Sequence, residues 1–200
     1  VHQGIREIEM LTNSFQELIN SISGAQMEVS KLEAIASRDR LTDLPNRISL
    51  DAFLARSQAR VSRRKDESLV ILFMDLDGFK TVNDTYGHGA GDKVLQETAR
   101  KLQGCIREDE IVARIGGDEF VAVLFATRGQ ELESVRAISA RIIQQVNEPV
   151  PLETAVVQVG CSIGGSIWDE SVSIEVTLHS ADEALYRAKR AGKNRLEFDG

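Results

Sequence analysis

A β-hairpin carrying two acids is predicted by the segment Ile111-Val112-Ala113-Arg114-Ile115-Gly116-Gly117-Asp118-Glu119-Phe120. β-Branched and aromatic residues fill the runs 111–115 and 120–125, and the two glycines between them suit a tight turn. Adjacent carboxylates at a hairpin tip repel each other, so the turn alone does not explain Asp118 and Glu119. Such acids indicate metal binding, proton abstraction or both, although a Gly-Gly turn alone is weak evidence of either.

Composition favours one globular core with an appendage. The chain has 200 residues, 42% hydrophobic content and a net charge of −7, which argues against a general nucleic-acid or membrane-surface binder. Cys105 and Cys161 are too few for a disulfide framework and lack metal-ligand spacing, which fits a cytoplasmic location. The sequence contains no bilayer-spanning apolar stretch and no signal peptide, and its start at Val1 predicts a piece of a longer protein.

Residues 1–38 carry a heptad repeat. Its two sets of positions are Val1, Ile8, Phe15, Ile22, Val29 and Ala36, and Gly4, Leu11, Leu18, Ala25 and Leu32. The repeat predicts an N-terminal signalling helix that forms a parallel coiled-coil dimer. The alternative is one amphipathic helix packed on its own domain. Residues 6–15 also resemble the closing helix of a HAMP linker, which implies an upstream sensor or HAMP domain and a parent protein anchored in the inner membrane.

Residues 39–200 alternate between predicted helices and strands. Helices are expected over residues 47–62, from 79, and over 93–103, 131–146 and 178–191, with a break at 87–92. Strands are expected over residues 69–74, 111–115, 120–125 and 195–198, and over 156–167 with interruptions at Gly160 and Gly164-Gly165. This alternation predicts an α/β or α+β domain in which helices cover a sheet.

A second group of acids follows a predicted buried strand. The apolar run 69–74 ends at Asp75-Leu76-Asp77, and ligands of open α/β sheets bind beyond the carboxyl ends of strands. If the hairpin lies beside this strand, Asp75 meets Asp118, and two close carboxylates need a cation or a shared proton. Such oxygen ligands, completed by substrate phosphates, are typical of Mg²⁺ sites for phosphoryl transfer. The alternative is a solvated acidic loop next to a helix-capping acid.

Several longer motifs occur in order across the domain. They are residues 39–47 (DRLTDLPNR), 75–92 (DLDGFKTVNDTYGHGAGD), 114–120 (RIGGDEF), 181–189 (ADEALYRAK) and 192–194 (GKN). On these motifs, the chain from Asp39 to Phe198 resembles the GGDEF domain of diguanylate cyclases. The resemblance implies a fold of the nucleotidyl-cyclase and polymerase-palm type, in which helices flank a central, mostly antiparallel sheet. It also implies that two GTP molecules are condensed to cyclic di-GMP, with release of two pyrophosphates.

The resemblance also implies catalytic and metal-binding roles. Asp75, Asp118 and the carbonyl of Leu76 would bind Mg²⁺, with Mn²⁺ as an alternative. Asp118 would take the ribose 3′-hydroxyl proton beside its required neighbour Glu119. Which of these two carboxylates holds the proton stays open, because coupled acids share their titration. Lys80 would offset charge in the transition state.

Other matching residues would contact GTP. Asn83 and Asp92 would hydrogen-bond guanine, because a carboxylate accepts from the N1–H and the exocyclic amine, which adenine does not offer. His88 lies in the same loop, with a capping or core histidine as the alternative. The phosphates would be held by Gly78 and the main chain of Phe79 and by Lys189 and Lys193, although each lysine taken singly is typical of a solvent-exposed charge. Residue 193 is often arginine in the family.

One segment departs from the family pattern. Many relatives carry an Arg-x-x-Asp product-inhibition site upstream of the hairpin, whereas this chain has Arg107 and Glu110. The extra methylene of glutamate moves the carboxylate by about one bond length, which is enough to disturb a tight hydrogen bond. The resemblance therefore leaves binding of cyclic di-GMP at Arg107 and Glu110 open.

The expected reaction requires two copies of the chain. Each domain would bind one GTP, so two sites must face each other in a homodimer with two-fold symmetry. A coiled coil over residues 1–38 would raise the effective concentration of the domains to the order of millimolar. The alternatives are a catalytically silent module that binds GTP or cyclic di-GMP, and a dimerisation element in which only the coiled coil acts. No nucleic acid and no direct membrane contact of this fragment are expected.

Overall fold

The structure is a computed structural model that describes Ile22 and residues 37–199. The chain divides into two units, residues 1–37 and residues 38–200, and the helices and strands from α2 to β7 belong to the second unit. The predicted coiled coil and its HAMP-like segment lie outside the described residues, apart from Ile22, Ser37 and Arg38. Both therefore stay predictions.

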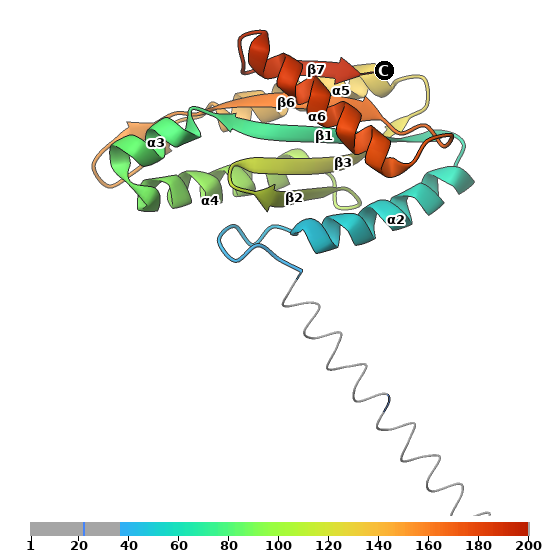
Figure 1. Ribbon diagram of the computed structural model, residues 1–200, viewed down its shortest axis with the longest axis horizontal. Helices are drawn as coiled ribbons and strands as arrows, with labels where there is room; N and C mark the ends of the chain where they lie inside the picture. The colour runs from blue at the N-terminus through green and yellow to red at the C-terminus, as the bar shows by residue number, and fades with distance from the viewer. Residues whose placement is uncertain (1–21, 23–36, 200) are drawn as a thin grey trace, which may run out of the picture. The chain divides into compact units, whose positions relative to one another are not determined.

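A mixed sheet forms the centre of the domain (Figure 1). Over residues 37–199 it contains five strands in the order β2-β3-β1-β6-β7. All neighbouring strands pair antiparallel except β6 and β7, which are parallel. The bounds are β1 (Glu67–Asp77), β2 (Ile111–Gly116), β3 (Glu119–Thr127), β6 (Gly160–Ile167) and β7 (Leu196–Asp199). The prediction of an α+β fold with a mostly antiparallel sheet is confirmed.

Helices cover both faces of this sheet. Leu69 and Ile71 of β1 pack in one apolar cluster with α2 (Arg47–Arg63) and the N-terminal part of α6 (Ile174–Arg190). Val70 and Leu72 belong to the opposite cluster, which contains α4 (His88–Cys105) and α5 (Glu131–Val146). Alternate residues of β1 thus serve two cores, which explains why its sequence is a continuous apolar run rather than an alternating one.

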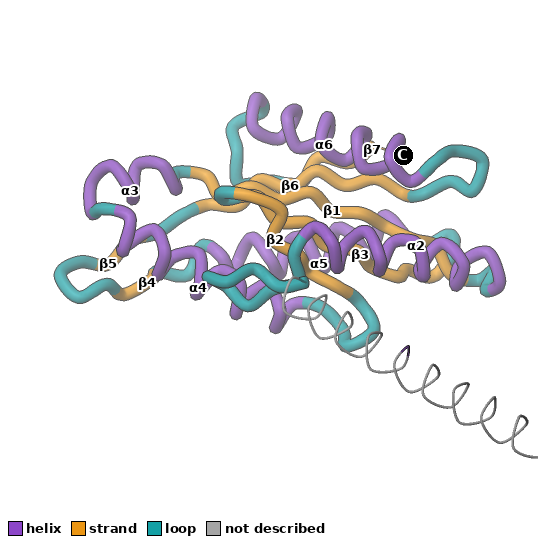
Figure 2. The backbone as a smooth tube through the Cα atoms, turned by 60° about the horizontal axis from the view of Figure 1, so that its bottom comes forward, coloured by secondary structure: helices purple, strands orange, loops and turns teal. Residues whose placement is uncertain are grey.

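The end of the molecule near the start of α4 is built from short elements. Figure 2 shows α3 (Phe79–Tyr86) and the start of α4 close to β4 (Val150–Pro151) and β5 (Val156–Val157). β4 and β5 form a two-stranded antiparallel sheet of their own. No helix among the described residues is long and apolar enough to cross a bilayer.

Several predicted boundaries were wrong. Helix α4 begins at His88, so the predicted break at 87–92 is a single corner at Gly87, whose φ of +83° reverses the chain between α3 and α4. Strand β1 continues to Asp77, and α6 begins at Ile174 rather than at Leu178. The helix over residues 131–146 is confirmed.

The glycine pair in β6 is not an interruption of the strand. β6 runs unbroken from Gly160 to Ile167, and a Cβ at Gly164 would lie 2.1 Å from the carbonyl oxygen of Ala181 in α6. A Cβ at Gly165 would lie 2.5 Å from the ring of Phe198. These glycines therefore permit close packing of α6 on one side and of β7 on the other.

Candidate functional site

Two acidic motifs meet at one end of the sheet. In the strand register, Asp75 of β1 lies opposite Glu119 of β3 and opposite Ser162 of β6. The main-chain N–H of Leu76 donates to the carbonyl oxygen of Asp118 across 3.3 Å. The hairpin therefore lies beside the strand that carries Asp75, which was the condition for Asp75 and Asp118 to meet. We call Asp75, Asp118 and Glu119 the acidic cluster.

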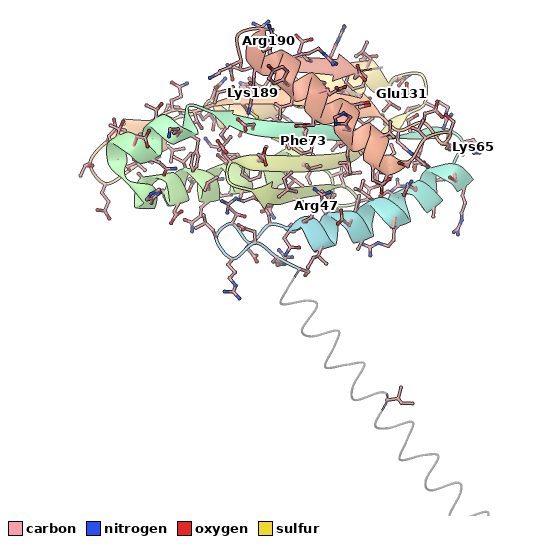
Figure 3. The ribbon with its side chains drawn as sticks, viewed as in Figure 1. Arg47, Lys65, Phe73, Glu131, Lys189 and Arg190 are labelled. Carbon is pink, nitrogen blue, oxygen red and sulfur yellow. The ribbon has the colours of Figure 1, made fainter. Side chains whose placement is uncertain are left out.

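A lysine of α6 reaches the acidic cluster. The ammonium nitrogen of Lys189 lies 2.7 Å from Oδ2 of Asp75, and the two side chains are 35% and 12% exposed. Figure 3 shows Lys189 beside Arg190 near the C-terminal end of α6. Such a partly buried pair is stronger than one at the surface, because water screens it less.

The cluster nevertheless carries an excess of negative charge. Burial raises the pKa of Asp75, repulsion by Asp118 and Asp77 adds to the rise, and the contact with Lys189 opposes it. Burial also raises the pKa of Glu119, with further contributions from Asp75 and Asp118. The deprotonated cluster is therefore costly to the folded protein, a condition that favours uptake of a cation or a proton.

The donor atoms present fit a hard divalent cation. Carboxylates of Asp75 and Asp118 and the main-chain carbonyl of Leu76 are the oxygen ligands that Mg²⁺ and Mn²⁺ accept. Over residues 37–199, no three acidic, histidine or cysteine side chains form a cage that could hold a metal by itself. Oxygens of a bound ligand would have to complete the coordination. Because Lys189 contacts Oδ2 of Asp75, a cation bound to this oxygen would take the place of the ammonium group.

The hairpin is held in place by Arg114, for which the sequence predicts no role of its own. Arg114 donates from Nε and Nη2 to the carbonyl of Gly117 at 3.0 and 2.7 Å, and from Nη1 to Asp39 at 2.8 Å. Burial raises the pKa of Asp39, but hydrogen bonds from Thr42 and Arg114 outweigh it and hold that pKa below the usual range. The segment that enters the domain is thereby tied to the turn that carries Asp118. An arginine and an aspartate in two separate motifs were the only sequence signal for this pair.

The predicted guanine-binding residues lie on two helices that meet at Gly87. The side chain of Asn83 in α3 is packed directly on α4, where a Cβ at Gly91 would come within 1.9 Å of its Oδ1. Asp92 lines a cavity of about 700 Å³ between α4 and residues 151–154. His88 is exposed in the first turn of α4, which excludes a core position for this histidine.

The remaining predicted phosphate-binding residues lie in α3 and in the turns before α3 and after α6. Lys80 is exposed at the start of α3, and its ammonium nitrogen is 3.8 Å from Asp84 rather than at the acidic cluster. Lys193 is exposed in the turn that follows α6. Gly78, with a φ of +85°, turns the chain from β1 into α3, while Phe79 is buried beneath it.

Arg107 and Glu110 border a different cavity, of about 380 Å³, which α5 also lines. The carboxylate of Glu110 accepts hydrogen bonds from the main-chain N–H groups of Arg107 and Phe125, at 2.8 and 3.3 Å. Both oxygens of this carboxylate therefore already accept hydrogen bonds from the main chain. Arg141 of α5 lines the same cavity and donates to the carbonyl of Cys105, a contact that the sequence did not predict.

Comparison with known proteins agrees with this geometry. A family model described as diguanylate cyclase, GGDEF domain, matches residues 36–195. The chain belongs to the GGDEF family of diguanylate cyclases. The resemblance expected from the sequence motifs is confirmed.

Named relatives of this GGDEF domain include diguanylate cyclases. The chain is 37% identical over 196 residues to diguanylate cyclase TpbB of Pseudomonas aeruginosa, covering 95% of this chain and 44% of TpbB. It is 34% identical over 197 residues to diguanylate cyclase DosC of Escherichia coli, covering 97% of this chain and 41% of DosC. The chain thus spans less than half the length of these curated relatives.

Solved structures of GGDEF proteins share the fold. Diguanylate cyclase SiaD of Pseudomonas aeruginosa, solved in complex with its activator SiaC, superposes with a TM-score of 0.75 at 33% identity. That match covers 99% of this chain and 74% of the SiaD chain. The polymerase-palm type of fold expected for a GGDEF domain is therefore confirmed.

The charge balance of the acidic cluster yields a pH-dependent prediction for Lys189→Met in buffer with EDTA. Removing the ammonium raises the folded-state pKa of Asp75 further above its unfolded value. A carboxyl group with a raised pKa loses its stabilising contribution as the pH rises through that pKa. The variant should therefore lose about 2 kcal/mol of unfolding free energy at pH 7 and little below pH 4. Urea unfolding at several pH values measures this difference.

Lys93→Met is the matched control for this substitution. Lys93 also pairs with an acid, Glu97, but at 3.6 Å on the exposed side of α4. Its loss should change the unfolding free energy by less than about 0.5 kcal/mol at any pH. An equal loss for Lys189→Met at pH 4 and pH 7 would contradict the electrostatic explanation and assign the effect to packing.

Proposed function

We propose that this domain condenses two molecules of GTP into cyclic di-GMP and releases two pyrophosphates. The observation that carries the proposal is the meeting of Asp75 with the intact Asp118 and Glu119 beside Lys189, in a chain of the GGDEF family. Relatives that align over nearly the whole chain are named diguanylate cyclases. The excess negative charge of the cluster supports a role in handling a cation and a proton.

Asp75, Asp118 and the carbonyl of Leu76 are the proposed ligands of Mg²⁺, for which Mn²⁺ can substitute. The ion would supply charge stabilisation to the phosphate oxygens during phosphoryl transfer. Lys189 leaves Asp75 when the nucleotide binds and holds a terminal phosphate, because an ammonium group gains more from phosphate oxygens than from a carboxylate already neutralised. Lys80 and Lys193 contribute further positive charge around the triphosphate.

The proton of the ribose 3′-hydroxyl is taken by the pair Asp118 and Glu119. The raised pKa of Glu119 supports this role, since a carboxylate with a higher pKa is a stronger base. Asp118 and Glu119 are neighbours in the chain, so the role of base is assigned to the pair rather than to one residue.

Guanine is selected by Asn83 and Asp92. The carboxylate of Asp92 accepts from the N1–H and the exocyclic amine of guanine, and adenine has no donor at its N1. Rejection of ATP follows, because adenine offers this carboxylate no N1–H, and an acceptor that a bound base leaves without a donor is costly. Gly91 contributes by leaving room for the carboxamide of Asn83. His88, Gly78 and the main chain of Phe79 line the path from the base to the phosphates.

The active species is a homodimer with two-fold symmetry. The product joins two equivalent nucleotides, so each of two facing sites must supply one GTP and one attacking hydroxyl. The predicted coiled coil would hold the domains near each other and transmit an upstream signal. The same proposal includes an upstream sensor in the parent protein. It places this domain in the cytoplasm and the anchor of the parent protein in the inner membrane. Glu110 already accepts hydrogen bonds from main-chain N–H groups, which disfavours product inhibition through Arg107 and Glu110.

A silent module that binds GTP or cyclic di-GMP is the second candidate function. Such a module needs neither a metal site nor a base, so nothing would maintain the costly cluster of Asp75, Asp118 and Glu119. The raised pKa values of Asp75 and Glu119, both caused first by burial, therefore favour the enzyme.

The catalytic proposal predicts that Asp118→Ala abolishes synthesis of cyclic di-GMP. Loss of a base and a metal ligand should lower turnover by roughly a thousandfold, whereas the unfolding free energy should not fall, because repulsion within the cluster is relieved. The assay measures cyclic di-GMP formed from GTP and Mg²⁺ by the purified wild type and variant. Asp51→Ala on the exposed side of α2 is the control and should leave the rate unchanged. Absence of product from dimeric wild-type protein would sink the proposal.

The dimer proposal predicts that turnover per chain falls on dilution. The fall should begin at a higher protein concentration when residues 1–36 are deleted, because the tether is then lost. Initial rates of cyclic di-GMP synthesis over a range of protein concentrations measure this dependence. Turnover per chain that stays constant down to nanomolar protein, with and without residues 1–36, would exclude the role of tethering.

The guanine proposal predicts an unusual effect of Gly91→Ala. Alanine in a helix normally stabilises by about 1 kcal/mol relative to glycine, but here its Cβ would displace the carboxamide of Asn83. The KM for GTP should rise about tenfold while thermal stability is kept. Gly104→Ala in the same helix is the control, since nothing lies within 4 Å of its added Cβ. An unchanged KM for Gly91→Ala would contradict the placement of Asn83 at the base.

A further inference from the structure

β1 carries a second aspartate that the proposed reaction does not use. Asp77 follows Asp75 by two residues, and alternation along a strand puts both side chains on the same face of the sheet. Asp77 lies opposite Gly160 in the register with β6. Its surroundings differ from those of Asp75, because the contacts of Asp77 lead to the turn after α6 and not to a lysine side chain.

A network of hydrogen bonds joins Asp77 to this turn. Oδ2 of Asp77 accepts from the hydroxyl of Ser162 at 2.8 Å and from the main-chain N–H of Asn194 at 2.9 Å. The side-chain oxygen of Asn194 accepts from the main-chain N–H of Cys161 at 3.1 Å. Ser162 is fully buried. We call Asp77, Ser162 and Asn194 the clamp.

The clamp holds a turn whose backbone is unfavourable. Lys193 and Asn194 have φ values of +62° and +49°, a left-handed conformation that residues other than glycine rarely adopt in succession. The N–H of Lys193 donates to the carbonyl of Ala188 at 3.0 Å, which closes the end of α6. Hydrogen bonds with Asp77 and Cys161 then fix Asn194. Lys193 is therefore held by its own bond to Ala188 and by the bonds of the residue that follows it.

The clamp packs closely against Gly160, where a side chain would not fit without a shift of its neighbours. A Cβ at Gly160 would lie 3.1 Å from Oδ1 of Asn194 and 3.2 Å from Cβ of Asp77. Oδ1 of Asp77 is buried and, among the described residues, has no hydrogen-bond partner. The protein thus keeps a half-buried acid at this position although its buried Oδ1 contributes no hydrogen bond, so the contacts of Oδ2 must outweigh that cost.

We propose that Asp77 is a positioning residue for the nucleotide triphosphate, acting through Ser162 and Asn194 on Lys193. The clamp holds the turn after α6 so that Lys193 and Lys189 present their ammonium groups at the same end of the sheet. This inference rests on the proposed function for the identity of the ligand, a nucleotide carrying β- and γ-phosphates. Asp77 itself does not touch the substrate.

The test compares two nucleotides that differ in these phosphates. The probes are GMP and α,β-methylene-GTP, whose α–β bridge is not cleaved, and binding is measured by calorimetry with Mg²⁺. Asp77→Ala should weaken binding of the triphosphate about tenfold and that of GMP less than twofold. Asp77→Asn should bind both within twofold of the wild type, because its amide oxygen can accept both hydrogen bonds. Asp51→Ala serves as the matched surface control.

A double-variant cycle tests whether Asp77 acts through Lys193. Lys193→Ala should weaken binding of the triphosphate, and adding Asp77→Ala should weaken it no further. If Asp77→Ala does not fold, Asn194→Gly replaces it, since glycine accepts the left-handed turn and removes only the contact with Cys161. This variant should show the same selective loss for the triphosphate.

The outcomes separate this inference from the proposed function. Equal losses for GMP and the triphosphate, binding by Asp77→Asn as weak as that by Asp77→Ala, or independent effects of Asp77 and Lys193 would each overturn the positioning role. Normal binding of both nucleotides by Asp77→Ala would overturn it too, while the proposed function would stand. A wild-type protein that binds neither nucleotide would overturn both.

Discussion

The pairing of β1 with β3 is the constraint on which the rest of the structure depends. Its register puts Asp75 opposite Glu119, and because side chains alternate along a strand, a slip of one residue would turn these acids to the other face. The same register directs Ile71 toward α2 and Leu72 toward the α4 and α5 core. Packing of the two cores therefore enforces the meeting of the acids.

The two aspartates of β1 have different kinds of partner, which suit them to different roles. Asp75 is held by the ammonium group at the end of a long lysine side chain. Asp77 is held by a buried hydroxyl and a main-chain N–H, which are fixed partners. A carboxylate bonded to fixed donors positions other groups, whereas one that faces a lysine and like charges remains available to a ligand. The cost of the acidic cluster to folding is offset by the cores on either side.

The sequence predicted the regular elements better than their ends. The apolar run in β1 and the helix over 131–146 were recognised because hydrophobic periodicity reports burial directly. The sequence does not predict the start of α4, because Gly89 and Gly91 disfavour a helix, and only the packing of Asn83 on Gly91 explains the second of them. The glycines of β6 predict interruptions of the strand, because the approach of the α6 backbone to Gly164 cannot be read from the strand itself.

By itself, the sequence determined the family and predicted which residues form the site: the hairpin acids, the acids after β1, the asparagine and the lysines. Local patterns suffice for this, because turns, strand periodicity and motif spacing are properties of neighbouring residues. Only the tertiary structure decided which of these groups touch. The pairing of Lys189 with Asp75, the anchoring of the hairpin by Arg114, and the clamp at Asp77 join segments far apart in the chain. Such contacts depend on how helices settle on the sheet, a choice made by side-chain packing that no local pattern encodes.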